Sequence, residues 1–191
     1  MRVVVVTPPE DFSVVTMERA KAHLNREGVD GDDALIAAMI AGAVASVDGP
    51  SGWLGRSLGR QQLEARFDGF DCGSLRLPYG PVRQIVSVSY IDGNGVAQTI
   101  AADQYELLGP SLMPVFGAAW PVPRWQRESV RVRYWAGYDE EMPVPANAVS
   151  AILLMIGDLF KHRETTTVSQ IAQTPMSASV ELLLQPLRVY A

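Results

Sequence analysis

The spacing of hydrophobic and polar residues divides the chain into three regions. Up to about residue 59, apolar residues recur at helical intervals. Thr16 can cap a first helix that Gly28 ends, and the acidic segment "VDGDD" can cap a second helix at residues 33–47. We expect the buried stripe of this second helix to contain Leu35, Met39, Ala43 and Val47.

Between about residues 60 and 140 the spacing changes to the alternation typical of β-strands. In "SVRVRYW" the valines and Tyr134 face one side, and Arg131 and Arg133 face the other. The segment "IVSVSYI" alternates in part, and the "DGNG" that follows it is the strongest hairpin signal in the chain. This region is therefore predicted to be a β-sheet module built from short strands.

Helical spacing returns after about residue 141. Pro143 and Pro145 lie at or just before the start of the segment 144–164 and suit a first helical turn, and the segment is apolar around much of its circumference. A helix of this kind is buried on more than one side. Its apolar face contains Ile152, Met155, Ile156, Leu159 and Phe160.

Together the three regions predict an α+β fold, a small helical bundle interrupted by an antiparallel β-sheet module. Residues 1–59 form the N-terminal helical part, and residues 60–140 form the β-sheet insertion. Residues 141–191 form the C-terminal helical part that completes the bundle, and they end in a tethered short helix within "SASVELLLQPLRVY". A chain of 191 residues suits one domain, or one domain that carries an insertion.

The composition argues against several classes of protein. The 16 basic and 21 acidic residues give a net charge of −5, which disfavours a protein held mainly by phosphate contacts. The single Cys72 forms neither an internal disulfide nor a cysteine zinc site. The apolar run 148–160 contains Asp158 and falls short of the roughly 20 residues of a membrane span. The N-terminal valine run is too short for a signal peptide, so we expect neither secretion nor membrane contact.

No segment provides a catalytic, metal or cofactor site. The segment "KHRE" contains His162 but no nucleophile or orienting group, and its basic residues suit the last turn of a helix. "DGDD" lacks the later residues of a calcium-binding loop, and Cys72 has no nearby histidine. No glycine-rich phosphate motif is present. We therefore predict a protein that is not an enzyme and that needs no cofactor.

The aromatic segment "MPVFGAAWPVPRWQ" has two interpretations. Phe116, Trp120 and Trp125 either cover an open end of the sheet or form a contact surface, since Trp and Arg are enriched at interface hot spots. The basic strand face at Arg131 and Arg133 is interpreted as solvated, with DNA or a partner carboxylate as the alternative.

The C-terminal segment also has two interpretations. It either docks into a partner's groove as an amphipathic helix or packs on its own subunit. The side chains that would anchor it are Leu182, Leu183, Leu184 and Leu187.

The order of the segments points to one family. The chain contains, in this order, "TMERAKAHL", "DDALIAAMIAGAVASVDGPSGWLGRSL", "RLPYGPVRQIVSVSYIDGNG", "VRVRYWAGY", "VPANAVSAILLMIGDLFKHRE" and "VELLLQPLR". In this order they resemble the head–tail connector (adaptor) proteins of long-tailed bacteriophages, prophages and gene-transfer particles. The resemblance extends from about residue 13 to residue 188, and the leading "MRVVVVTPPED" has no counterpart in it.

The resemblance implies a structural protein in the neck of a virion or virion-like particle, assembled in the bacterial cytoplasm. In that family a ring of about twelve copies sits beneath the portal and continues the DNA channel toward the tail. The implied partners are other copies of the chain, the portal protein, a tail-side neck protein (the stopper) and DNA. The DNA passes through the lumen without sequence-specific contact, and the family carries no catalytic motif.

The residues themselves are compatible with a ring. Rings are built from heterologous interfaces, and the apolar helices offer more surface than a small bundle consumes. The interface candidates are Ile152, Met155, Ile156, Leu159, Phe160, Trp120, Trp125, Leu182, Leu183 and Leu187. The alternative is a small hydrolase or carbohydrate-binding protein that uses the β module. It would need a pocket with converging polar groups and perturbed carboxylates.

Overall fold

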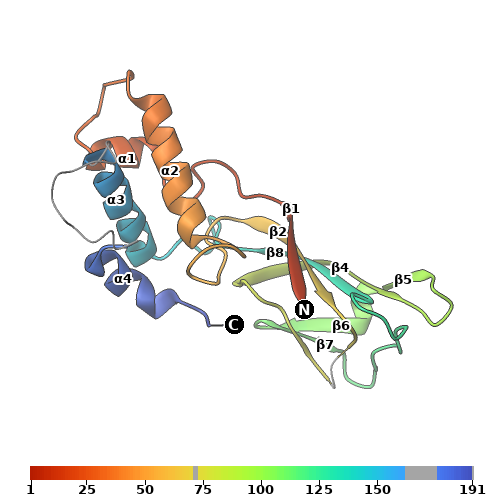
Figure 1. The fold of residues 1–191 in the computed structure, drawn as a ribbon. Helices are drawn as coiled ribbons and strands as arrows, with labels where there is room; N and C mark the ends of the chain where they lie inside the picture. The colour runs from red at the N-terminus through yellow and green to blue at the C-terminus, as the bar shows by residue number, and fades with distance from the viewer. Residues whose placement is uncertain (71–72, 162–175, 191) are drawn as a thin grey trace.

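A helical part and a β-sheet part lie side by side in the computed structural model, which describes residues 1–70, 73–161 and 176–190 (Figure 1). The helices are α1 (Met17–His23), α2 (Asp33–Val47), α3 (Ala146–Lys161) and α4 (Ala178–Leu184), with short 3-10 turns η1 (Ala102–Gln104) and η2 (Gln185–Leu187). The strands are β1 (Arg2–Thr7), β2 (Gln61–Phe67), β3 (Leu75–Arg76), β4 (Val82–Ile91), β5 (Ala97–Ile100), β6 (Tyr105–Leu108), β7 (Ser111–Pro114) and β8 (Val130–Ala136). The predicted α+β class with an antiparallel sheet module is confirmed.

The strands form two antiparallel sheets with one shared core. The larger sheet has the order β1-β2-β8-β4-β5, and the smaller has the order β3-β7-β6. The core between them is apolar because alternate strand residues face inward. Its buried side chains are Leu63, Ala65, Phe67, Leu75, Leu77, Val88, Leu112, Val130, Val132, Tyr134 and Ala136.

The alternation predicted for β8 is confirmed. Its valines and Tyr134 are fully buried, whereas Arg131 and Arg133 are exposed. The "DGNG" hairpin is confirmed as well, because it joins β4 to β5 and the Asp92 carboxylate accepts hydrogen bonds from the N–H groups of Asn94 and Val96.

The N-terminal valine run forms a strand, which differs from the helical character expected for residues 1–59. Strand β1 pairs with β2 and forms one edge of the larger sheet. Consecutive β-branched residues favour extended backbone over helix, which explains the difference. The chain therefore enters the sheet before it builds the first two helices.

The first helix starts as predicted but ends early. Thr16 accepts a hydrogen bond from the N–H of Arg19 at 3.3 Å and so caps α1. The helix ends at His23 rather than near Gly28, since Asn25 already adopts a φ of 53°. The expected cap thus holds, whereas the expected length was wrong.

The second helix buries a different stripe from the one predicted. Its buried residues are Ile36, Ile40, Ala43 and Val47. Leu35, which was assigned to this stripe, is 39% exposed. The two stripes differ because apolar residues lie side by side in the first turns, where Leu35 precedes Ile36 and Met39 precedes Ile40. Periodicity alone does not choose between adjacent apolar residues.

The acidic residues before α2 act through ion pairs rather than through side-chain capping. Asp32 occupies the cap position without a side-chain capping hydrogen bond. The ammonium group of Lys21 in α1 lies 3.1 Å from a carboxylate oxygen of Asp30 and 2.6 Å from one of Asp33. These contacts tie α1 to the start of α2.

Helix α3 forms the centre of the helical part, where it packs against α1, α2 and α4. Within the described residues the interior is built mainly from α2, α3 and α4 side chains. Its larger buried members include Ile36, Ile40, Leu54, Leu58, Val149, Ile152, Ile156, Val180 and Leu184. The predicted basic helix end, "KHRE", lies outside the described residues beyond Lys161.

The C-terminal segment packs on its own subunit in this structure. The side-chain amide of Asn147 donates to the carbonyl of Leu183 at 3.0 Å, and the N–H of Val189 donates to the carbonyl of Leu54 at 2.8 Å. The guanidinium of Arg188 lies over the Trp53 ring, 4.0 Å from its centroid. These contacts anchor α4 and the residues that follow it.

Two leucines in α4 test this packing. Leu184 is fully buried and Leu182 is 77% exposed. Leu184→Ala is expected to lower the free energy of unfolding by about 3 kcal/mol, because it leaves a cavity in the helical core. Leu182→Ala is expected to change it by less than about 0.5 kcal/mol. Urea denaturation of both variants checks this, and equal effects would contradict the packing of α4.

Candidate interaction surfaces

The loop between β7 and β8, residues 115–129, is called the Trp125 loop here, and its aromatic residues have different environments. Trp120 stacks on Phe70, with ring centroids 4.7 Å apart and an interplanar angle of 10°, and it packs against the sheet core. Phe116 and Trp125 are fully exposed, at 105% and 101%. Trp120 therefore covers the core, whereas Phe116 and Trp125 are available for contacts.

Backbone contacts hold the Trp125 loop on both sides of Trp125. The N–H of Arg124 donates to the carbonyl of Ile91 at 2.7 Å. The N–H of Glu128 donates to the carboxylate of Asp68 at 2.9 Å. The exposed indole is thus presented from an anchored loop, which reduces the entropy that a partner contact would have to overcome.

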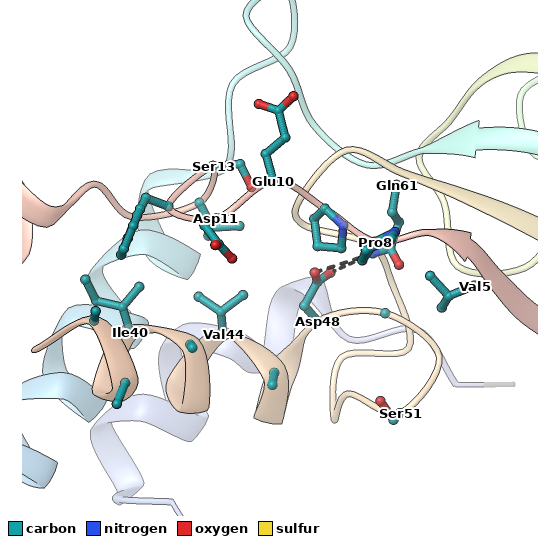
Figure 2. Close-up of a pocket in the computed structure, with 18 of the residues that line it drawn as sticks. Val5, Pro8, Glu10, Asp11, Ser13, Ile40, Val44, Asp48, Ser51 and Gln61 are labelled. Carbon is teal, nitrogen blue, oxygen red and sulfur yellow. Dashed lines mark hydrogen bonds between the residues drawn. The ribbon is translucent and has the colours of Figure 1, made fainter. Parts of the chain in front are cut away.

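A cavity of about 570 Å³ lies between α2 and the chain that leaves β1, and we call it the α2 cavity (Figure 2). Small and apolar α2 side chains form one wall. The opposite wall is the segment 8–14, in which Asp11 points toward α2 and Glu10 points away from it. Asp48 and Gln61 close the end nearest the sheet (Figure 2).

Asp48 joins the end of α2 to the start of β2. Its carboxylate accepts a 2.5 Å hydrogen bond from the N–H of Leu58 and a 3.3 Å bond from the side-chain amide of Gln61. Burial disfavours the charged form and raises the pKa of Asp48 from 3.8 to about 6, although these hydrogen bonds act in the opposite direction. The carboxylate is thus a buried structural link that costs stability once it is ionised.

The raised pKa predicts a pH-dependent stability difference between the wild type and Asp48→Asn. Below pH 3.8 the carboxyl is protonated in both states, and between pH 3.8 and about 6 only the unfolded state ionises it. Rising pH therefore favours unfolding of the wild type, by about 3 kcal/mol in total at neutral pH. The asparagine variant lacks this loss.

Urea denaturation of both proteins from about pH 4 to about pH 7 measures this difference. The free energy of unfolding of Asp48→Asn should rise relative to that of the wild type as pH increases through this interval. The substitution can also change the free energy of unfolding by an amount that is the same at every pH, and this constant difference does not affect the comparison of the two pH profiles. Parallel pH profiles would show that Asp48 keeps an ordinary pKa.

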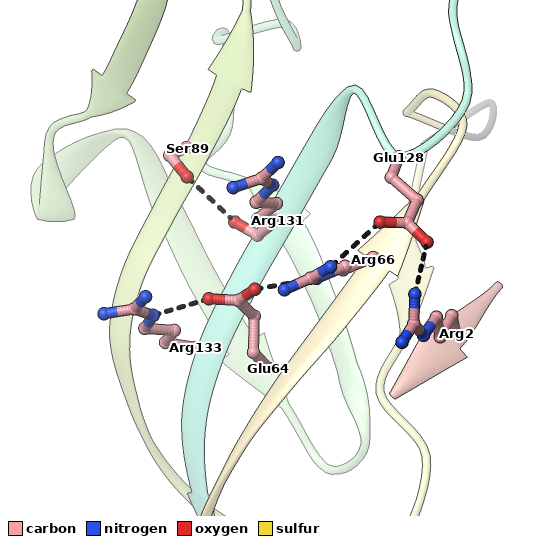
Figure 3. Close-up of polar contacts among 7 residues, drawn as sticks. All are labelled: Arg2, Glu64, Arg66, Ser89, Glu128, Arg131 and Arg133. Carbon is pink, nitrogen blue, oxygen red and sulfur yellow. Dashed lines mark hydrogen bonds and ion pairs between the residues drawn. The ribbon is translucent and has the colours of Figure 1, made fainter. Parts of the chain in front are cut away.

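The exposed face of the larger sheet carries a chain of ion pairs rather than an open basic surface (Figure 3). Glu64 is 4% exposed and accepts hydrogen bonds from Arg133 at 2.6 Å and from Arg66 at 2.8 Å. Arg66 also contacts Glu128, which lies 3.6 Å from Arg2. Burial would raise the pKa of Glu64, but the hydrogen bonds from the two arginines outweigh it, and the pKa lies below its usual value.

These ion pairs bear on the two interpretations of the basic strand face. Arg133 shares the carboxylate of Glu64 with Arg66, and the Arg131 side chain forms no ion pair within the described residues. Glu64 and Glu128 offset part of the arginine charge, so the face presents less positive charge than its arginines alone imply, which weakens its binding to phosphates.

Glu64→Gln is expected to lower the free energy of unfolding by about 2 kcal/mol. The substitution removes the buried carboxylate to which the guanidinium groups of Arg66 and Arg133 donate hydrogen bonds. Arg133→Gln serves as the matched control, because the Arg133 side chain is half-exposed, and its effect should be about 0.5 kcal/mol or less. Chemical denaturation of the two variants provides the measurement. A larger loss for the arginine variant than for Glu64→Gln would refute the assignment of Glu64 as the centre of the network.

The structure separates the predicted interface residues into buried and accessible groups. Ile152 and Ile156 are fully buried inside their own subunit, so they cannot contact a neighbour in this conformation. Four others are partly buried against the helical core, and these are Met155, Phe160, Leu183 and Leu187. Trp120 is partly buried against the sheet core. Leu159, Leu182 and Trp125 are exposed, and their role in an interface stays a prediction.

Sequence reasoning did not find the α2 cavity or the buried Asp48. One available signal was the position of Asp48, a charged residue directly after the buried Val47. Within the described residues, no three His, Cys, Asp or Glu side chains are grouped to hold a metal ion. No helix of the described part has the length and apolar character of a membrane span. His162 and Cys72 lie outside the described residues.

Comparisons with known proteins identify the fold. No protein-family model and no curated protein matches the sequence. A chain from the neck of an empty gene transfer agent (GTA) particle, computed with C6 symmetry, matches with a TM-score of 0.75 at 18% identity, and the match covers 100% of this chain and 97% of that chain. A chain from the neck of the native GTA particle, computed with C12 symmetry, gives 0.74 over the same shares at the same identity.

A chain from the virion of the native GTA particle also gives a TM-score of 0.75 at 18% identity, over 100% of this chain and 97% of that chain. The agreement includes both the helical part and the sheets, since it extends over the full length. The protein therefore has the fold of a chain found in GTA particles, including structures of their neck.

Proposed function

We propose that the protein is a structural neck component of a virion or GTA-like particle, with the role of a head–tail adaptor. The observation that carries this proposal is the full-length structural match to neck chains, which leaves no large part of either chain unmatched. An independent argument is the order of the sequence segments, which resembles that of connector proteins. The protein would act after assembly in the bacterial cytoplasm and would be found in the neck.

The adaptor role includes a ring of about twelve copies beneath the portal. The C6 and C12 symmetries of the similar neck structures support a ring. Exposed apolar side chains on separate parts of the subunit supply surfaces for such an assembly, among them Trp125 and Leu182. The portal and a tail-side stopper are the remaining protein partners in this proposal.

DNA would pass through the ring without sequence-specific contact. A net charge of −5 and the ion-paired arginines of the sheet face favour a channel that releases DNA rather than one that holds it. A protein with this role performs no catalysis. The alternative, a small hydrolase or carbohydrate-binding protein, has less support, because the perturbed carboxylate of Asp48 already accepts hydrogen bonds from the N–H of Leu58 and from the side-chain amide of Gln61.

The test is assembly with the portal protein of the same particle. The purified chain should bind the portal as a ring of about twelve copies, visible in electron micrographs and measurable as a discrete mass increase. Bovine serum albumin in place of the chain controls for non-specific binding. A chain that stays monomeric with the portal and binds a small carbohydrate at a saturable site would favour the alternative instead.

A further inference from the structure

We propose that the Trp125 loop of one copy inserts into the α2 cavity of a second copy, and that this contact joins successive subunits. The inference rests on the proposed ring function and deepens it by naming the two surfaces. Trp125 is fully exposed on an anchored loop, and the α2 cavity is open on the same subunit. Neither feature is thus occupied by the described residues of its own subunit.

The cavity suits an aromatic side chain. Its volume of about 570 Å³ lies within the range of pockets that hold small ligands. The α2 wall is formed by short side chains, including Ala37, Ala41 and Val44, so a flat ring can approach the helix backbone closely. An indole placed there would bury apolar surface that is fully exposed in the free subunit.

The charges of the two surfaces are opposite. The described residues that line the cavity include Asp11, whose carboxylate points toward α2, and also Glu10 and Asp48, but no lysine or arginine. Arg124 and Arg127 flank Trp125, and neither forms an ion pair within the described part of the chain. Opposite charges at the rim orient two copies before the apolar contact forms, and Trp with Arg is the typical composition of an interface hot spot.

The sheet prevents a subunit from filling its own cavity. Gln61 begins β2 and lines the cavity, whereas Phe67 ends β2 and pairs with Val130, which directly follows the Trp125 loop. The seven residues of β2 separate these ends by about 20 Å. The loop and the cavity therefore meet only between copies. Because the two surfaces differ, the contact is heterologous and generates a ring when its rotation closes.

Two pairs of variants test the contact. Trp125→Ser removes the inserted side chain, and Phe116→Ser changes an equally exposed ring on the same loop. Ala41→Trp obstructs the cavity, and Ala34→Trp places the same bulk at an exposed position of α2 that does not line it. Circular dichroism and the urea midpoint first establish that each variant keeps the wild-type fold.

Self-association is measured by sedimentation of the free chain over a concentration series, and ring formation by electron microscopy with the portal. Trp125→Ser and Ala41→Trp should each raise the concentration needed for association by about tenfold or more, while the two controls match the wild type. Arg127→Glu should also weaken association, and combining it with Asp11→Arg should restore it.

The outcomes separate this inference from the adaptor role. If wild-type rings form on the portal and both test variants form them equally well, the contact is refuted while the adaptor role stands. If only Trp125→Ser is defective, Trp125 binds another surface and the cavity assignment is wrong. A wild type that associates neither alone nor with the portal refutes both the contact and the adaptor role.

Discussion

The position of the helical part relative to the β-sheet part depends on the buried carboxylate of Asp48. It lies at the end of α2 and accepts hydrogen bonds from Leu58 and Gln61, which lead into and begin β2. Burial makes its charged form costly, so the site is stable only while these donors remain in place. The same residues close one end of the α2 cavity, and the shape of the cavity therefore depends on this link.

Local patterns predicted the elements better than they predicted the contacts between them. The alternation around Tyr134 and the hairpin after Ile91 require only neighbouring residues, and both predictions held. The position of Leu35 was wrong because only the packed partner decides which of two adjacent apolar residues is buried. The link from Asp48 to Gln61 was unpredicted, since it joins residues whose proximity results from tertiary folding.

The candidate interface residues illustrate the same limit. Apolar residues have the same spacing along a helix whether the helix face packs inside its own subunit or against a second copy. In α3 the residues with this spacing include the buried Ile152 as well as the exposed Leu159. The Trp125 loop was interpreted either as a cover or as a contact surface. The structure assigns Trp120 to the cover and leaves Trp125 exposed, a division that depends on the position of Phe70.

A heterologous contact closes a ring only if every copy is rotated by the same angle relative to the last. A loop and a cavity on flexible parts of a subunit would allow a range of angles and would also form open chains. Here the strands between them are hydrogen-bonded on both sides, because β2 lies between β1 and β8. The ion pair between Glu64 and Arg133 further connects β2 with β8. A sheet braced in this way holds the loop and the cavity at a constant separation, and that constancy is what a closed ring requires.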